Sequence, residues 1–405
     1  MLIPSDQDTL RLVLARGGTS KGLYFHAQDI PPAGPERDAL LCRLMGSPDL
    51  NQIDGLGGAK PVTSKLAIIG PSTRDDADVE YTFGQVQLDE MSVDYTGNCG
   101  NISSGVGPFA IDEGLVTPTA PSTTVRIHNT NTDKILIADV PVIGGRAAVQ
   151  GDATIAGVPG TGAPITMDWK GTVGSATGSL LPTGHPVDDI QLESGRTVTV
   201  SIVDAGNITC WVAASDVGLT GSEQAGEIEK NKDVMTSFFE IRAKAAALAG
   251  LVDDWTEANS PNRALPLTGA VAAPGDYTAA DGTDIACDTM DLRVRLIFLD
   301  RLHPTIAGTG SMGLTAAARV PGSVVEQAGT AKTDSGALRI GHPGGVMTTY
   351  VETGPNDRDA TPTFTKLVMI RTARRLMSGL AYVPIEDRPE PITTHHSKGA
   401  VHEGA

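Results

Sequence analysis

Glycine and proline interrupt this chain so often that few of its segments can form a long helix. Its 405 residues include 47 glycines and 26 prolines, whereas aromatic residues make up only 4 %. Glycine favours turns and proline ends helices, so the sequence predicts short strands joined by many turns. Residues 233–251 are the clearest exception, because their apolar side chains fall along one stripe at helical spacing.

The length and the order of the elements predict two domains, since single cores rarely grow beyond roughly 250–300 residues. Strands, a small-residue turn, a helix and further strands occur once in each half of the sequence. The turn-rich segment at residues 183–186 is the expected linker. It separates an N-terminal domain (residues 1–185) from a C-terminal domain (residues 186–385), whose last strand can return to the first domain. Residues 386–405 lack periodicity and are expected to be disordered.

Charge and hydropathy exclude several classes of protein. The net charge of −17 argues against a nucleic-acid partner, which needs a clustered basic surface. Neither an apolar run of membrane-spanning length nor an apolar leader occurs, so no membrane contact and a cytoplasmic location are expected. An acidic protein that binds an anion must build its positive potential locally, from a few basic side chains and helix N-termini.

The four cysteines are too widely spaced for a zinc site or a disulfide framework. Cys42, Cys210 and Cys287 lie among apolar or strand residues and are interpreted as small buried side chains. Cys99 differs, because it lies in the polar segment at residues 98–105, NCGNISSG, before a helix expected to end near Gly114. A helix N-terminus favours the thiolate, which makes Cys99 a candidate base or proton carrier. Its neighbours Asn98, Gly100 and Asn101 are expected to hold a substrate carboxylate.

Two further segments of the first half carry polar groups that packing does not require. The glycine-rich turn at residues 16–22, RGGTSKG, offers backbone N–H groups and the side chains of Thr19, Ser20 and Lys21 to an anion. It lacks the spacing of a nucleotide-binding loop, and a plain tight turn is the alternative. Lys65 opens an apolar strand, where partial burial favours a neutral, proton-accepting amine; a solvated surface lysine is the alternative.

The strand at residues 78–88 changes its apolar phase at residues 84–85, which predicts a bulge or a bend. In the second half, three loops carry amide, imidazole or hydroxyl groups that are candidates for substrate binding. A short helix at residues 315–319 is expected to follow one of them, a glycine-rich turn at residues 308–311. Lone histidines in loops are more often structural, and that alternative applies to His342 as well. The binding candidates are Asn207, His303, Thr309, Gly310 and Ser311.

Taken in order, these segments resemble the PrpF family, which contains 2-methylaconitate cis–trans isomerase, 3-methylitaconate Δ-isomerase and 4-oxalomesaconate tautomerase. The resemblance extends over nearly the whole chain and includes residues 16–22, 45–49, 52–55, 63–65, 98–101, 105–110 and 370–375. Four more segments are most similar to the 3-methylitaconate Δ-isomerase branch: residues 69–73, 128–132, 157–161 and 339–343.

The resemblance implies a diaminopimelate-epimerase-like α+β fold, with two pseudo-symmetric domains that each wrap a mixed sheet around a central helix. It implies that Lys65 and Cys99 transfer protons, and that the loops around Ser20, Asn207 and Thr309 line the cleft between the domains. Diaminopimelate epimerase uses two opposed thiols, one from each half. Residues 308–313 of this chain contain no cysteine, so a 1,3 proton shift is expected in place of inversion at a stereocentre.

The expected function is a cofactor-independent isomerase that moves a C=C bond in a small unsaturated di- or tricarboxylic acid such as methylitaconate. The sequence has no motif for a metal or a nucleotide, and the expected partner is the anionic substrate. A homo-oligomer is left open, as is the division of roles between Lys65 and Cys99. The alternatives are an aconitate, 2-methylaconitate or 4-oxalomesaconate isomerase with the same chemistry, or a non-catalytic protein that only binds an organic acid.

Overall fold

The computed structural model describes residues 6–259, 265–330, 336–354 and 361–384, so the predicted disordered tail lies outside the described residues. The helices are α1 (Pro35–Met45), α2 (Gly100–Ser103), α3 (Val106–Asp112), α4 (Ala225–Ile228), α5 (Lys232–Leu248), α6 (Trp255–Ala258), α7 (Gly308–Ala317) and α8 (Val324–Ala328). Short 3₁₀ helices are η1 (Ala27–Asp29), η2 (Pro61–Thr63), η3 (Lys170–Thr172), η4 (Ala214–Val217) and η5 (Cys287–Thr289).

The strands up to the middle of the chain are β1 (Gln7–Gly17), β2 (Ser20–His26), β3 (Lys65–Pro71), β4 (Val79–Val86), β5 (Val93–Asp94), β6 (Ser122–Asn129), β7 (Lys134–Ile143), β8 (Arg146–Ala147), β9 (Ala153–Ile155), β10 (Val158–Gly162) and β11 (Ile165–Asp168). The later strands are β12 (Asp188–Gln191), β13 (Thr197–Ala205), β14 (Asn207–Ala213), β15 (Leu267–Ala272), β16 (Tyr277–Thr278), β17 (Asp284–Ile285), β18 (Leu292–Phe298), β19 (Arg301–Leu302), β20 (Ala337–His342), β21 (Gly345–Thr353), β22 (Phe364–Arg371) and β23 (Ala373–Pro384).

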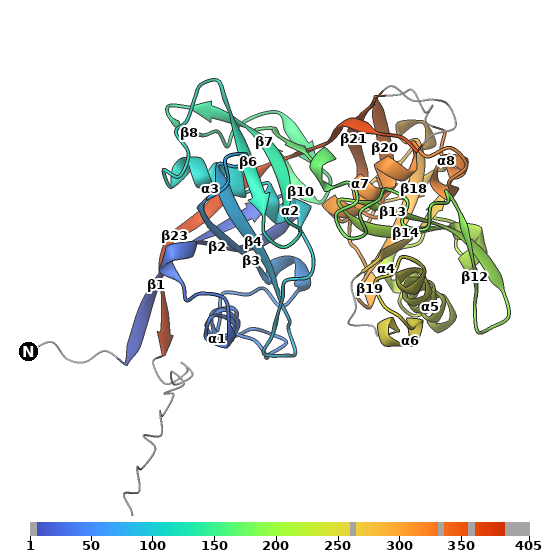
Figure 1. Ribbon diagram of the computed structural model, residues 1–405, viewed down its shortest axis with the longest axis horizontal. Coiled ribbons are helices and arrows are strands. Elements are labelled where there is room, and N and C mark those ends of the chain that lie inside the picture. The colour runs from blue at the N-terminus through green and yellow to red at the C-terminus, as the bar shows by residue number, and fades with distance from the viewer. Residues whose placement is uncertain (1–5, 260–264, 331–335, 355–360, 385–405) are drawn as a thin grey trace, which may run out of the picture.

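The first half is a mixed sheet wrapped around a helix (Figure 1). Antiparallel and parallel pairs alternate across this sheet. The pairs β1–β2, β3–β4 and β6–β7 are antiparallel, whereas β2–β3 and β4–β6 are parallel. The connection from β4 to β6 contains α2 and α3, which pack inside the sheet. The connection from β2 to β3 contains α1, which packs on the outer face.

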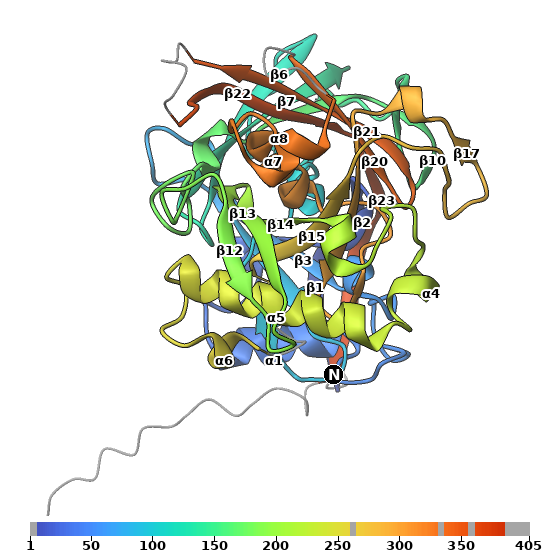
Figure 2. The ribbon, with the colours of Figure 1, turned by 90° about the vertical axis from the view of Figure 1, so that its right-hand side faces the viewer.

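The second half repeats this arrangement with different residues. Strands β13, β14, β15, β18, β20 and β21 pair with the same alternation of antiparallel and parallel neighbours. The inner helices α7 and α8 lie in the connection from β18 to β20, just as α2 and α3 lie in the connection from β4 to β6. Helix α5 lies on the outer face. Figure 2 shows α7 enclosed by strands while α5 and α1 flank the outside. β3, β4 and α2 therefore correspond to β15, β18 and α7.

Strand β22 joins the halves, because it pairs with β11 on one side and with β21 on the other. The chain then returns along β23, which pairs with β1 over the full length of that strand. Helices on both faces bury the central strands completely, which explains the apolar run at residues 66–69 and the largely apolar segment at residues 208–212. The domain boundary at residue 185 stays a prediction. None of the helices in the described ranges is both long and apolar enough to span a membrane.

The structure corrects two predictions about the first half. The pairing of β3 with β4 is regular from Lys65–Gln85 to Pro71–Val79, so the bulge expected at residues 84–85 is absent from this pair. The apolar phase changes there because the end of β4 is buried on both faces. The single helix expected after Cys99 is divided into α2 and α3 at Gly105, where a side chain would collide with the phenol of Tyr24.

A third prediction fails in the second half. Residues 308–311 are not a turn before a helix at residue 315 but the first turn of α7, which begins at Gly308. Every residue of α7 is buried, and the small residues allow the helix to lie against the sheet. At Gly313, for example, a Cβ would lie 2.6 Å from the hydroxyl oxygen of Thr209.

Candidate active site

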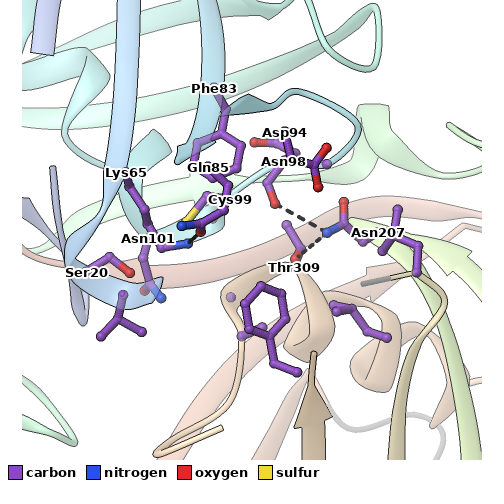
Figure 3. Close-up of a pocket in the computed structure, with 18 of the residues that line it drawn as sticks. Ser20, Lys65, Phe83, Gln85, Asp94, Asn98, Cys99, Asn101, Asn207 and Thr309 are labelled. Atoms are coloured by element: carbon purple, nitrogen blue, oxygen red, sulfur yellow. Dashed lines mark hydrogen bonds between the residues drawn. The ribbon is translucent and has the colours of Figure 1, made fainter. Parts of the chain in front are cut away.

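The Lys65 and Cys99 segments meet in one pocket between the two halves (Figure 3). The pocket has about 740 Å³ of empty space, including the part open to solvent. Its walls carry Lys65, Phe83, Gln85 and Cys99 from the first half and face residues of the second half. The predicted site residues in the lining are Ser20, Lys65, Asn98, Cys99, Gly100, Asn101, Asn207, His303 and Thr309.

Lys65 is the first residue of β3, and only 6 % of it is exposed. Its Nζ donates a 2.7 Å hydrogen bond to Oε1 of Gln85 and lies 5.2 Å from the ring centroid of Phe83 and 5.8 Å from that of Phe298. Among the described residues, no carboxylate lies within ion-pair distance of this amine. Lys65 is therefore a buried amine held by a neutral acceptor and two aromatic rings, and the alternative of a solvated surface lysine is wrong.

The orientation of Gln85 is fixed by its own amide group. Its Nε2 donates to three backbone oxygens, those of Pro61 at 3.1 Å, Ser64 at 3.0 Å and Val86 at 3.2 Å. Because only the Nε2 side can donate, Oε1 must point toward Lys65. Sequence reasoning missed Gln85, although the change of phase in β4 at this residue was the available signal.

Cys99 is half-buried and immediately precedes α2, whose first residue is Gly100. Gly100 has no room for a side chain, since a Cβ would lie 2.7 Å from the methyl carbon of Met369 and 3.2 Å from Gly308 at the start of α7. The two inner helices therefore meet end to end beside the pocket. Ala307 stands before α7 where Cys99 stands before α2, and Leu267 opens β15 where Lys65 opens β3. The pocket is lined by all four residues.

The side chain of Asn207 connects the second half to the backbone of the first half beside the pocket (Figure 3). Nδ2 of Asn207 donates to the hydroxyl of Thr309 at 3.0 Å and to the backbone oxygen of Asn98 at 3.3 Å. Oδ1 of Asn98 accepts from Ser103, but its buried Nδ2 has no partner among the described residues. A buried donor without a partner is costly, so Asn98 is a ready group for an acceptor on a ligand.

His303 contributes a neutral imidazole to the pocket. Burial, together with the positive charges of Lys65 and Arg371, lowers the pKa of His303 to about 4. The backbone N–H of Thr305 donates to Nδ1 at 3.1 Å, which places the proton of the neutral ring on Nε2. His303 is therefore a hydrogen-bond donor near neutral pH.

Four predicted binding residues have other positions or partners. Thr19 lies outside this pocket, where its hydroxyl accepts from Nδ2 of Asn101 at 3.0 Å. Lys21 is absent from the lining because side chains alternate along β2, and Ser20 faces the pocket. Gly310 and Ser311 face the interior, since only the first two residues of α7 reach the pocket. The Ser311 hydroxyl donates to the oxygen of Gly308 at 2.7 Å.

The glycines of the turn at residues 16–22 serve packing rather than an anion. A side chain on Gly17 would collide with the backbone of Asn101, and one on Gly18 would collide with its side-chain amide. Gly18 also has a φ of 51°, in the left-handed region that favours glycine. The tight-turn alternative is therefore the better description of this segment, which packs closely against α2.

The other cysteines divide into two classes. Cys42 and Cys210 are buried, and burial raises the pKa of both thiols, to about 11 for Cys42. Cys287 is exposed, so its interpretation as a buried side chain is wrong. It lies in the short helix η5, outside the strands, and its hydrogen bond with Asp276 raises the pKa of its thiol. Within the described ranges, no group of three or more His, Cys, Asp or Glu residues is arranged to hold a metal.

Comparison with known proteins agrees with this geometry. The family model described as PrpF protein matches residues 7–384. The chain belongs to the PrpF family. Curated PrpF relatives include the 3-methylitaconate isomerase of Eubacterium barkeri, which is 47 % identical over 94 % of this chain and 98 % of that protein. The 2-methyl-aconitate isomerase of Cupriavidus necator is 37 % identical over 91 % of this chain and 96 % of that protein. The 4-oxalomesaconate tautomerase of Pseudomonas putida is 37 % identical over 93 % of this chain and 97 % of that protein.

Solved structures support the same family and fold. A crystal structure of methylitaconate-delta-isomerase has a TM-score of 0.81 and 46 % identity over 97 % of this chain and all of that one. A hydroxyproline epimerase from Agrobacterium vitis shares the fold, with a TM-score of 0.52 over 93 % of both chains at 14 % identity. The predictions of an isomerase and of a diaminopimelate-epimerase-like α+β fold are confirmed.

Proposed function

We propose that this pocket moves the C=C bond of a small unsaturated di- or tricarboxylic acid by a 1,3 proton shift, with methylitaconate as the first candidate substrate. The relatives named for 3-methylitaconate and 2-methyl-aconitate support this substrate class. The higher identity to the former, 47 % against 37 %, favours the dicarboxylate. The reaction uses side chains of this chain and needs no metal or nucleotide.

The observation that carries the proposal is the one-sidedness of the pocket. Lys65 and Cys99, the two candidate proton carriers, come from the first half, and their equivalents in the second half are Leu267 and Ala307. Inversion at a stereocentre requires groups on opposite faces of the carbon. A 1,3 shift requires proton carriers on one face only, because the proton can leave one carbon and return two atoms away.

The proton comes from the carbon that lies next to both the C=C bond and a carboxylate. Lys65 as a neutral amine, or Cys99 as a thiolate, takes this proton, and the electron pair of the C–H bond moves into a dienolate. The charge of the dienolate spreads onto the carboxylate oxygens. Return of the proton to the far carbon of the original C=C bond moves the double bond and restores the base.

Neutral donors around the pocket hold the carboxylates and the developing charge. Among the described residues, Nδ2 of Asn98 has no hydrogen-bond partner and Nε2–H of His303 has no acceptor. Donors fixed in place before the reaction stabilise a developing oxyanion better than water does, because they need not reorganise. Because its ring is neutral and its Nδ1 accepts from the N–H of Thr305, His303 serves as a hydrogen-bond donor and not as the base.

Incubation in D₂O with methylitaconate, 2-methylaconitate and 4-oxalomesaconate, followed by proton NMR, tests the proposal. We expect deuterium at the allylic carbon and a shifted double bond, fastest with methylitaconate. Faster turnover of a tricarboxylate would show that methylitaconate is not the preferred substrate, but it would agree with the proposed proton shift. Binding of these acids without exchange or turnover would refute the proposal and identify a non-catalytic organic-acid-binding protein.

A further inference from the structure

A second cavity lies on the other side of the contact between Thr19 and Asn101. It has about 1160 Å³ of empty space, including the part open to solvent, and shares no lining residue with the Lys65–Cys99 pocket. Its walls come from β9 and the residues on either side of it, from β21 and from the end of β22. The polar side chains that concern a ligand are Thr19, Asp152, Thr305, His342, Thr348 and Arg371.

Arg371 places a buried cation in the wall of this second cavity. It is 2 % exposed, and its Nε donates to Oδ1 of Asn101 at 3.1 Å while its Nη1 donates to the oxygen of Ile370 at 3.0 Å. Burial lowers the pKa of Arg371 to about 10, so the guanidinium is still charged at neutral pH. Within the described ranges, its Nη2 has no hydrogen bond and no carboxylate lies within ion-pair distance. The hydrogen-bond partners of this buried cation are neutral oxygens, and a cation buried among neutral groups is unfavourable, so an anion at Nη2 would compensate its charge.

His342 adds a neutral donor to the same cavity. The backbone N–H of Gly344 donates to Nδ1 of His342 at 3.2 Å, so the proton of the neutral ring lies on Nε2. Burial and the nearby positive groups, including Arg371, keep the ring neutral by lowering its pKa to about 3. Nε2 has no partner among the described residues, which leaves it available to an acceptor in the cavity.

The rest of the lining indicates which anion fits. Arg371 is the cation of the cavity, and the one acidic side chain in the described lining, Asp152, is exposed. A single cation with neutral donors matches one carboxylate better than a doubly charged phosphate. The apolar side chains of Ile155, Ile306 and Val346 suit the carbon skeleton of an organic acid.

We propose that this second cavity is a binding site for a small organic carboxylate, with Arg371 as its cation and His342 as a neutral donor. The carboxylate pairs with Nη2 of Arg371, and Nε2–H of His342 donates to its second oxygen. The site is separate from the Lys65–Cys99 pocket, although Asn101 contacts Arg371 on one side and lines that pocket on the other. Its occupation does not depend on turnover.

Calorimetric titration with succinate, a saturated acid that cannot be isomerised, tests the site on the full chain. Ala156 lines the cavity at the turn between β9 and β10, so Ala156→Trp fills the cavity without removing a polar group. Arg371→Gln removes the cation. Arg374→Gln is the matched control, because it removes an equal charge from an exposed position three residues away. We expect one equivalent of succinate to be lost in Ala156→Trp, or its Kd to rise at least about tenfold.

Arg371→Gln should lose the same equivalent, and Arg374→Gln should bind as the unmodified protein does. Succinate bound in the Lys65–Cys99 pocket contributes a separate equivalent, which Ala156→Trp leaves in place. If Ala156→Trp titrates like the unmodified protein, or if Arg371→Gln and Arg374→Gln are indistinguishable, the proposal is overturned. A protein that fails to isomerise any acid in D₂O can still pass this test, so the two proposals fail independently.

Discussion

Replacing His303 by glutamine should make the protein more resistant to mild acid. In the folded protein the pKa of His303 is about 4, because the ring is buried beside Lys65 and Arg371. In the unfolded chain the ring recovers an ordinary pKa of about 6.5. Between these two values the unfolded chain binds a proton that the folded protein does not. Stability is therefore lost as the pH falls through 6.5, and the loss is complete below about 4.

The two pKa values give the size of the effect. A difference of about 2.5 units corresponds to about 3.4 kcal/mol at the acid limit. From pH 8 to pH 5 the contribution of His303 is about 2 kcal/mol, because the folded ring is still neutral at pH 5. Glutamine does not titrate, so His303→Gln should lose about 2 kcal/mol less than the unmodified protein over this interval. A lost hydrogen bond to Thr305 would lower stability equally at both pH values.

Urea unfolding at pH 8 and pH 5 measures this difference directly. His342→Gln is the matched comparison, because His342 is also buried, has its pKa lowered to about 3 and should show a similar reduction in the pH dependence of stability. A substitution at the exposed His185 should leave the difference in stability between pH 8 and pH 5 unchanged. If His303→Gln shows the pH dependence of the unmodified protein, then folding does not lower the pKa of His303, and its assignment as a neutral donor is wrong.

Four further outcomes test the site. Lys65→Met should lower kcat at saturation at least about 100-fold, whereas Lys60→Met, at an exposed position, should not; a loss within about tenfold would contradict general base catalysis. Gln85→Leu removes the acceptor of Lys65 and should lower kcat about tenfold or more, and an effect on KM alone would refute a positioning role. An unsaturated dicarboxylate should slow the labelling of Cys99 by iodoacetate but not that of the exposed Cys287, as peptide mapping would show; an unprotected Cys99 would move the active site elsewhere. Dialysis against a chelator should leave activity unchanged, and restoration of lost activity by a divalent ion would contradict the proposed chemistry.

The features that sequence alone could predict are those with a local physical signal. The helix at Pro35–Met45 has proline at its first position and a left-handed Gly46 at its end, and both are visible as residue types. The long helix α5 follows from its apolar stripe. The polar segment before α2 pointed to Cys99, whereas Lys65, the first residue of β3, gained its proposed role only from the resemblance to the PrpF family.

The features that sequence could not predict depend on contacts between distant segments. The turn at residues 16–22 has glycines because α2 packs against it, and this pattern is indistinguishable from an anion-binding turn until Asn101 is placed beside it. Ser311 carries a hydroxyl in a glycine-rich segment, but that segment is a helix buried by the surrounding sheet. Gln85 was hidden for the opposite reason, since a polar residue inside an apolar strand has a role only once its partner is known.

The two halves share the same order of strands although their residues differ. Pairing alternates between antiparallel and parallel in the same way in both halves, and this fixes only where elements begin and which faces are buried. At two equivalent positions beside the pocket the halves then differ in chemistry. Lys65 and Cys99 can carry protons, whereas Leu267 and Ala307 cannot. Proton carriers on both sides of a pocket suit inversion, whereas carriers on one side suit the proposed movement of a proton along one face of a planar acid.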